Sequence, residues 1–267
     1  MANNISFPKL GISLDVSPVA FSIGSKEIYW YALIILFGFM LGLLYVARDC
    51  EKQGISKDNV LDIALYGIVS GIIGARIYYV IFSFNEFSGD LLGIFRIWEG
   101  GLAIYGGIIA AVLSTLIYCR CKKINILNAL DVCCIGLLLG QAVGRWGNFV
   151  NCEVYGNATD FMLGMSINNA SPVHPLFLYE SIWCLAGVIV LSVLRNKKKK
   201  YGQIFLGYTL WYSIGRLVLE GMRDTDYILY VIPNILGISQ LVSGLLVVLS
   251  IIGLVYISKS NKECFRM

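Results

Sequence analysis

The stretch "LDVCCIGLLLGQAVGRWGNFVNCEVYG", residues 130–156, decides how this chain folds. Its first half is almost wholly apolar. Its second half brings Arg145, Asn148, Asn151 and Glu153 together within nine residues. A charged group at the centre of a bilayer costs on the order of 2.5–3.5 kcal/mol. An apolar run that ends in such a cluster indicates a spanning helix that opens onto a polar site at the membrane surface.

The rest of the chain is nearly as apolar as this stretch. Of its 267 residues, 57% are hydrophobic and 14% are charged, whereas a soluble domain carries about 25% charged residues. The composition therefore predicts a polytopic membrane protein and excludes a soluble domain with one anchor. The net charge of +4 comes from short basic clusters between apolar runs, which indicates no nucleic-acid partner.

Seven segments are long and apolar enough to cross a bilayer, because a span needs roughly 20 mostly apolar residues. We place them at 28–47, 60–82, 101–119, 126–144, 174–194, 203–221 and 236–258. The expected fold class is all-α, with one integral-membrane domain over residues 1–267. An outer N-terminal arm at 1–27 and a short outer cap at 145–173 complete it.

The basic residues predict the orientation of these spans. Of the 21 Lys and Arg residues, 14 follow spans one, three and five or lie in the C-terminal tail, and four lie in links on the opposite side. The positive-inside rule then places the N-terminus outside and the C-terminus in the cytoplasm. An odd number of spans agrees with that orientation.

Arginines near the outer ends of three spans suggest a bound anion. Arg76 lies in the second span, Arg145 ends the fourth, and Arg216 and Arg223 belong to the sixth. Guanidinium groups pair with phosphate through two donors and stay charged when desolvated, so a phospholipid headgroup fits them. Two plainer interpretations stay open: a structural ion pair between Arg216 and Glu220, and an interface anchor at Arg145.

Two further motifs carry polar groups on the outer side. In "PVHPLFLYE", Pro175 suits the first turn of a helix, so His174 is expected as a cap or loop residue. Glu180 follows inside the span and needs a partner or a water-filled cavity. In "EGGLAIYGG", Tyr105 lies between two glycine pairs, which indicate either close helix packing or a pocket. The eight cysteines and one histidine show no metal-ligand spacing, so we expect no metal and no cofactor.

Taken in order, these motifs resemble the prolipoprotein diacylglyceryl transferases of bacteria. "GRWGNFVNCEVYG" meets every fixed position of the family signature. Four other stretches match the family in the right order: "FSIGSKEIYWYAL" (21–33), "IWEGGLAIYGG" (97–107), "HPLFLYE" (174–180) and "GRLVLEGMRD" (215–224).

The resemblance implies a multi-pass enzyme of the bacterial cytoplasmic membrane. Such an enzyme transfers the diacylglyceryl group of phosphatidylglycerol to the lipobox cysteine of a prolipoprotein signal peptide. The products are a thioether and glycerol 1-phosphate. The chemistry fits the residues, because arginines can stabilise the charge that grows on a leaving phosphate. No nucleophile on the enzyme is required, and Cys152 is not a fixed position of the signature.

The match also carries residue roles onto this chain. Asn148 and Asn151 would hydrogen-bond the headgroup or hold Arg145, and Glu153 would orient the cluster or take part in proton transfer. Asp131 matches an acidic position early in the fourth span. The expected catalytic residues are Arg145, Arg216, Glu153, Tyr105 and Asn148. The expected phosphatidylglycerol-binding residues are Arg145, Arg216, Asn148, Asn151, Gly156, Tyr31, Tyr212 and Glu220.

One departure from the family concerns Tyr105, where many members carry a histidine that has been proposed as the base. A tyrosine with a pKa of about 10 is a poor base at neutral pH, so we expect Tyr105 to position another group. The alternative function is an anion or lipid transporter with an arginine-lined path. The chain shows neither the internal repeat nor the paired broken helices of such transporters.

Overall fold

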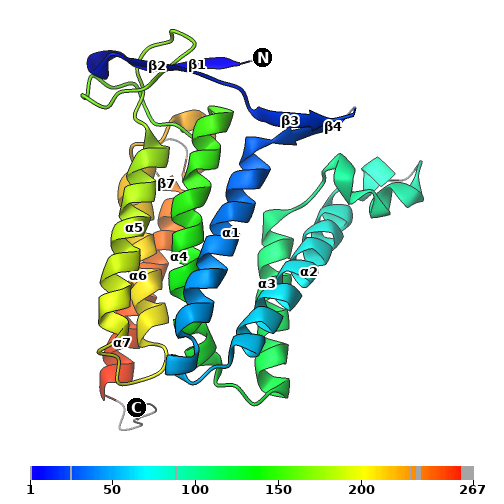
Figure 1. Cartoon of the computed structure of the whole chain (residues 1–267), viewed down its shortest axis with the longest axis vertical. Coiled ribbons are helices and arrows are strands. Elements are labelled where there is room, and N and C mark those ends of the chain that lie inside the picture. Colours follow the sequence, from blue (N-terminus) through cyan, green and yellow to red (C-terminus); the bar gives the residue numbers. More distant parts are fainter. Residues whose placement is uncertain (1, 25, 88, 229, 233–235, 260–267) are drawn as a thin grey trace. The chain divides into compact units, whose positions relative to one another are not determined.

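The structure is a computed structural model that describes residues 2–24, 26–87, 89–228, 230–232 and 236–259. This part of the chain holds seven α-helices, one at each predicted span (Figure 1). Lys262, Cys264 and Arg266 of the C-terminal tail lie outside the described residues. The helices are α1 (Trp30–Asp49), α2 (Lys57–Phe82), α3 (Ile104–Cys121), α4 (Ile126–Asn151), α5 (Leu176–Arg195), α6 (Gln203–Glu220) and α7 (Ile238–Lys259).

The helices fit a protein that crosses a membrane several times. Among the described helices, six are long and apolar enough to span a bilayer, and α6 is the exception. This helix carries Arg216 and Glu220 within its 18 residues. Its place as a seventh span, like the orientation of the chain, stays a prediction.

The expectation of an all-α chain was incomplete, because the N-terminal arm and the predicted cap form short strands. Strands β1 (Asn3–Phe7), β2 (Ile12–Val16) and β5 (Ser166–Ile167) make an antiparallel sheet in the order β2-β1-β5. Two hairpins pair β3 (Val19–Ile23) with β4 (Lys26–Tyr29) and β6 (Tyr230–Ile232) with β7 (Leu236–Gly237). Single-turn 3-10 helices fill the links: Pro8–Leu10, Glu51–Gln53, Phe84–Phe87, Leu91–Phe95, Ile97–Glu99 and Thr225–Tyr227.

The chain forms two compact units, one of residues 1–45 and 131–267 and one of residues 46–130. In the first unit, the core joins α4, α5 and α6. Helices α1 and α4 touch through glycines, because a Cβ at Gly42 would lie 2.5 Å from the carbonyl oxygen of Gly136. Small residues bring membrane helices this close. The core residues are Cys134, Ile135, Leu138, Ala142, Cys184, Leu191 and Ile204.

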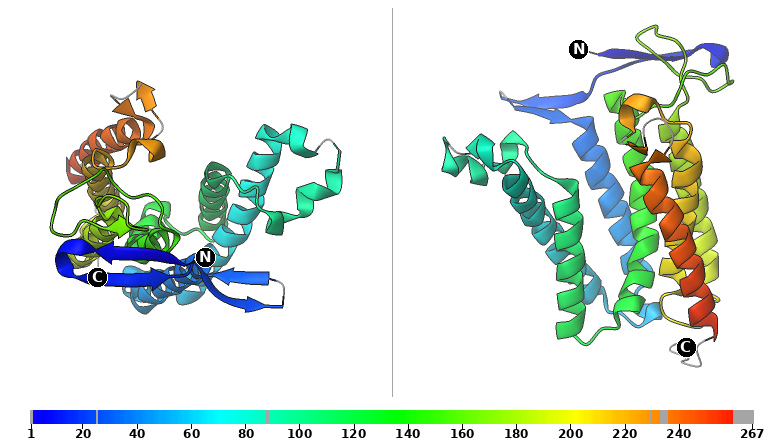
Figure 2. Two further views of the ribbon diagram at one scale, coloured as in Figure 1. Left: turned by 90° about the horizontal axis from the view of Figure 1, so that it is seen from above. Right: turned by 180° about the vertical axis from the view of Figure 1, so that it is seen from behind.

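The N-terminal sheet is fixed to the ends of α4 and α5 (Figures 1 and 2). Ile5 of β1 is fully buried and forms a cluster with Met165 and Phe177, against which Phe149 of α4 also packs. The aromatic rings of Phe149 and Phe177 lie 4.6 Å apart. The arm therefore covers the end of the bundle that carries the polar signature.

In the second unit, α2 and α3 pack closely, and Arg76 organises the link between them. A Cβ at Gly74 would lie 2.7 Å from the carbonyl oxygen of Gly106, so the second glycine pair serves helix packing. The Arg76 guanidinium donates to backbone carbonyls of the link at 2.6–2.9 Å. This corrects the expectation that Arg76 helps to hold an anion. The acceptors are the carbonyls of Gly93, Ile94, Gly100 and Gly101.

Asp131 of α4 caps the start of α6 in the first unit. Its buried carboxylate accepts hydrogen bonds from the backbone N–H groups of Gly202 and Phe205, both at 2.8 Å. The ammonium group of Lys198 lies 3.4 Å away. The first N–H groups of a helix have no partner within the helix, so this carboxylate satisfies donors that would otherwise be buried unpaired.

The Asp131→Ala variant tests this cap. We expect it to lower the free energy of unfolding by about 3 kcal/mol, because it removes a buried carboxylate that accepts from two backbone N–H groups and lies beside a buried ammonium. Thermal unfolding in detergent, followed by tryptophan fluorescence, measures the loss. Adding Lys198→Met should restore part of it, and the exposed Asp160→Ala serves as the control. Equal midpoints for Asp131→Ala and the control would contradict the assignment.

Candidate active site

Helix α4 continues to Asn151, beyond the predicted end of the span at 144. Arg145, Asn148 and Asn151 are therefore helical residues three apart, which places them along one face. The predicted outer cap begins after the helix instead of at residue 145. The polar half of the signature is thus a continuation of the spanning helix.

A sharp turn after α4 folds Glu153 back onto the helix. The backbone enters the left-handed region at Cys152 (φ 54°) and Val154 (φ 56°), which non-glycine residues adopt only when their surroundings hold them. The side-chain amide of Asn148 donates to Oε1 of Glu153 at 2.9 Å, and that of Asn151 donates to the same oxygen at 3.5 Å. Asn148 also accepts from Nη1 of Arg145 at 3.5 Å.

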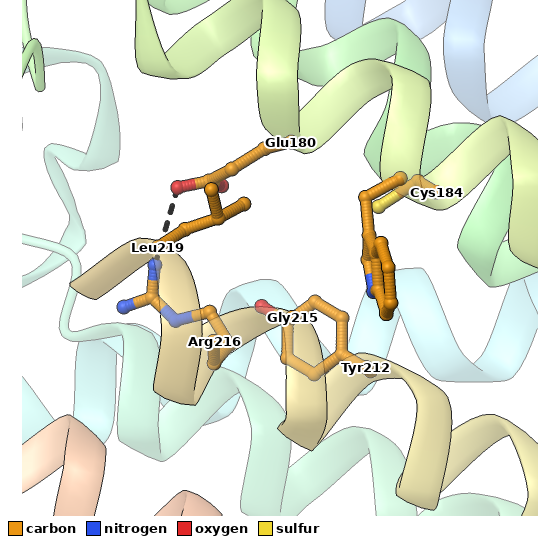
Figure 3. A pocket seen from close by; sticks show the side chains of 7 residues that line it. Glu180, Cys184, Tyr212, Gly215, Arg216 and Leu219 are labelled. Atoms are coloured by element: carbon orange, nitrogen blue, oxygen red, sulfur yellow. Dashed lines mark hydrogen bonds and ion pairs between the residues drawn. The ribbon is translucent and has the colours of Figure 1, made fainter. Parts of the chain in front are cut away.

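Glu180 of α5 is the centre of an ion-pair cluster. Its carboxylate, 6% exposed, lies 2.5 Å from Nε of Arg145, 3.5 Å from Nη1 of Arg216 and 3.3 Å from Nη2 of Arg223. Figure 3 shows the contact with Arg216. Glu180 was not among the predicted site residues. Its signal in the sequence was an acidic residue inside a span, which needed a partner.

Glu220 supplies the second carboxylate of this cluster. Its Oε2 lies 2.9 Å from Nη2 of Arg216 and 3.4 Å from Nε of Arg223, so the structural ion pair within α6 does form. Burial, followed by the charge of Arg216, lowers the pKa of Arg223. Three guanidinium groups thus face the carboxylates of Glu180 and Glu220, which leaves this group of five side chains with one positive charge.

A small pocket opens beside the ion pairs (Figure 3). One end carries the charges of Glu180 and Arg216, and the walls are largely apolar. Tyr212 lies one helical turn before Arg216 and faces the same pocket. The pocket therefore places apolar surface directly beside the charged groups of the cluster. The lining residues are Glu180, Trp183, Cys184, Tyr212, Gly215, Arg216 and Leu219.

Two other predicted residues hold the surroundings of the cluster. The ring of Tyr31 packs against α4 at Gly147, where an added Cβ would lie 2.7 Å from the ring. Gly156 is buried and donates its backbone N–H to the carbonyl of His174 at 2.9 Å. A Cβ there would lie 2.5 Å from the carbonyl oxygen of Met222. The absence of a side chain at Gly156 therefore lets its backbone approach that of Met222 closely. Contact between Gly156 and a substrate stays a prediction.

Tyr105 lies in the first turn of α3, in the second compact unit, and its side chain is 62% exposed. His174 precedes α5 as a loop residue, and its Nδ1 lies 3.4 Å from the hydroxyl of Tyr179.

Burial raises the pKa of the Cys152 thiol, so this cysteine stays protonated at neutral pH.

Comparisons with known proteins show which family the chain resembles. The family model for prolipoprotein diacylglyceryl transferases matches residues 18–256. A phosphatidylglycerol–prolipoprotein diacylglyceryl transferase of Bacillus velezensis is 39% identical over 252 residues, which cover 90% of this chain and 92% of that protein. The transferase of the same name from Clostridioides difficile is 41% identical over 245 residues, covering 92% and 97%. That of Streptococcus pyogenes is 41% identical over 259 residues, covering 93% and 96%.

The Glu180→Gln variant tests the ion-pair cluster without an activity assay. We expect a loss of about 3 kcal/mol in the free energy of unfolding, because three guanidinium groups then face a single carboxylate. Size-exclusion chromatography after stepwise heating in detergent measures the folded fraction. The surface variant Glu51→Gln is the control. A Glu180→Gln protein as heat-resistant as the unmutated chain would show that Glu180 is not the centre of the cluster.

Proposed function

Because the chain belongs to the prolipoprotein diacylglyceryl transferase family, we propose that the cluster around Glu180 is its transfer site. The protein is a multi-pass enzyme of the bacterial cytoplasmic membrane with phosphatidylglycerol–prolipoprotein diacylglyceryl transferase activity. The family membership removes the transporter alternative. The observation that supports the site most strongly is the excess of guanidinium over carboxylate groups beside a pocket with apolar walls.

The transfer reaction requires stabilisation of the charge on the leaving phosphate and alignment of the two substrates. The thiol of the lipobox cysteine loses its proton, and the sulfur attacks the saturated carbon of the diacylglyceryl group that bears the phosphate ester. A carbon–sulfur bond forms as the carbon–oxygen bond breaks, and glycerol 1-phosphate leaves with the electron pair. Negative charge grows on the departing phosphate, where preorganised donors are most effective. Both substrates are amphiphiles, so a fixed orientation in the membrane contributes proximity.

In this proposal, Arg145 and Arg216 bind the phosphate from two sides. They come from α4 and α6 and meet at Glu180, which fixes their directions before a substrate arrives. Arg145 is further oriented by Asn148. Glu220 pairs with Arg216 from one turn after it, and Tyr212 hydrogen-bonds with Arg145. Preorganisation of this kind avoids rearrangement as the phosphate departs.

Glu153 is our candidate for the group that takes the thiol proton. Asn148 and Asn151 both donate to Oε1 of its carboxylate, which holds the side chain over α4. The second oxygen is then available to the substrate thiol. Tyr105 keeps the positioning role expected from the sequence.

We also propose that α6 is the seventh span and that the N-terminal sheet lies outside the cell. The distribution of Lys and Arg supports this orientation. The sheet packs on the end of α4 at Phe149, one helical turn after Arg145, so the transfer site would face the outer leaflet. A prolipoprotein whose lipobox cysteine emerges at that leaflet could then reach the site within the membrane.

The Arg145→Ala variant tests the phosphate-binding role. We expect transfer to fall by at least about a hundredfold, the scale seen when one charge-stabilising donor is removed. Arg145→Lys should be intermediate, because a lysine keeps the charge and loses the paired donors. The assay uses purified protein, labelled phosphatidylglycerol and a lipobox peptide. The exposed Arg120→Ala is the control for the loss of an arginine, and near-normal labelling by Arg145→Ala would contradict the assignment.

The Tyr105→Phe variant tests whether the hydroxyl takes part in proton transfer. A positioning role predicts a rate loss of less than about tenfold, or 1.4 kcal/mol. The same labelling assay measures it, with the exposed Tyr256→Phe as the control. A loss of several orders of magnitude would show that the Tyr105 hydroxyl is required.

A further inference from the structure

Two tryptophans interlock α5 and α6 beside the pocket. The indole N–H of Trp183 donates to the backbone carbonyl of Trp211 at 3.0 Å, and the indole N–H of Trp211 donates to the carbonyl of Trp183 at 3.0 Å. Their rings stack with centroids 4.5 Å apart and an interplanar angle of 20°. We call this reciprocal pair the tryptophan clasp.

Each ring of the clasp lies over a glycine of the opposite helix. A Cβ at Gly187 of α5 would lie 2.5 Å from Nε1 of Trp211. A Cβ at Gly215 of α6 would lie 2.5 Å from Cδ1 of Trp183. The two glycines therefore allow the rings to sit against helix backbone, and the clasp sets how closely α5 and α6 approach.

The clasp adjoins the charged residues of the transfer site along both helices. On α6, Trp211 directly precedes Tyr212, and Gly215 directly precedes Arg216. On α5, Glu180 lies one turn before Trp183, and both line the pocket. A change in the distance between the two helices at the clasp would therefore move Glu180 relative to Arg216.

We propose that the tryptophan clasp is a positioning device for the transfer reaction. It holds α5 and α6 at the spacing that lets Glu180 contact Arg145 and Arg216 at once. This inference rests on the proposed function, because it assumes that these arginines stabilise the leaving phosphate. Trp183 and Trp211 act as positioning residues in this proposal, because the side chains that contact the leaving phosphate are the arginines.

Two physical points favour a positioning role over ordinary packing. The hydrophobic effect does not drive helices together within lipid, so specific contacts set their spacing. The Glu180–Arg216 contact, at 3.5 Å, is already long, and a small separation of the helices would break it. A misplacement of about 1 Å in an active site can lower a rate about a hundredfold.

The Gly187→Ala variant is the sharpest test, because Gly187 does not line the pocket. Alanine is the better helix former, so the change does not weaken α5 as a helix. Its methyl group would instead push against Trp211. We expect kcat to fall about tenfold, with KM for phosphatidylglycerol within about twofold and an unchanged folded fraction. The matched control is Gly244→Ala on α7, where a Cβ has nothing within 4 Å.

A second set of variants keeps the test decisive if Gly187→Ala folds poorly. Trp183→Phe and Trp211→Phe each retain a ring and remove one of the two hydrogen bonds. A clasp that acts as a unit predicts that the double variant loses little more activity than either single variant. In an Arg216→Lys background, Trp183→Phe should have a smaller effect, since the clasp works in part through that arginine.

The same labelling assay separates the possible outcomes. Unchanged kcat in folded Gly187→Ala, Trp183→Phe and Trp211→Phe would overturn the positioning role, and so would an undiminished Trp183→Phe effect in the Arg216→Lys background. Absence of transfer by the unmutated chain would contradict the proposed function itself. Loss of kcat in all three folded variants, absent in Gly244→Ala, supports the clasp.

Discussion

A buried carboxylate among arginines is the constraint on which the rest of the first unit depends. Charges within a bilayer must be compensated, so the helices that carry Arg145, Glu180 and Arg216 have to meet at one level. The glycine contacts between α1 and α4, the cap that Asp131 places on α6, and the sheet over the helix ends all maintain that meeting. The apolar core supplies the bulk of the packing, and the ion pairs select one arrangement of the helices.

The two sets of arginines show how the same side chain serves different purposes. Arg76 donates to backbone carbonyls of the link between α2 and α3, which is built from short 3-10 turns, and so supplies hydrogen bonds that a longer helix or a sheet would have supplied. Arg145, Arg216 and Arg223 bind carboxylates instead. The donors of Arg76 are occupied by backbone carbonyls, whereas the second set places three guanidinium groups beside two carboxylates and so gathers an excess positive charge next to the pocket.

The sequence predicted the parts of this structure that depend on hydrophobicity, and missed those that depend on tertiary partners. All seven helices lie at predicted spans, because apolar runs about 20 residues long have few alternatives. The last turns of α4 were missed, since Arg145, Asn148 and Asn151 read as a polar link until Glu153 and Glu180 are seen to satisfy them. The sequence showed that Glu180 needs a partner, but only the fold shows that its partners are three arginines. The short strands of the arm pair with each other and with residues 166–167, far along the chain, which local patterns cannot reveal.

The central carboxylate has a consequence for how the site handles its ligands. In the proposed site, Glu180 already binds the guanidinium groups as a phosphate would, so an incoming headgroup exchanges some of these ion pairs for its own. The exchange weakens net affinity, because one favourable ion pair is given up for another. It also assists departure, since the carboxylate is always at hand to reclaim the arginines from the released phosphate. A site arranged in this way favours turnover over retention, which suits an enzyme whose lipid substrate surrounds it.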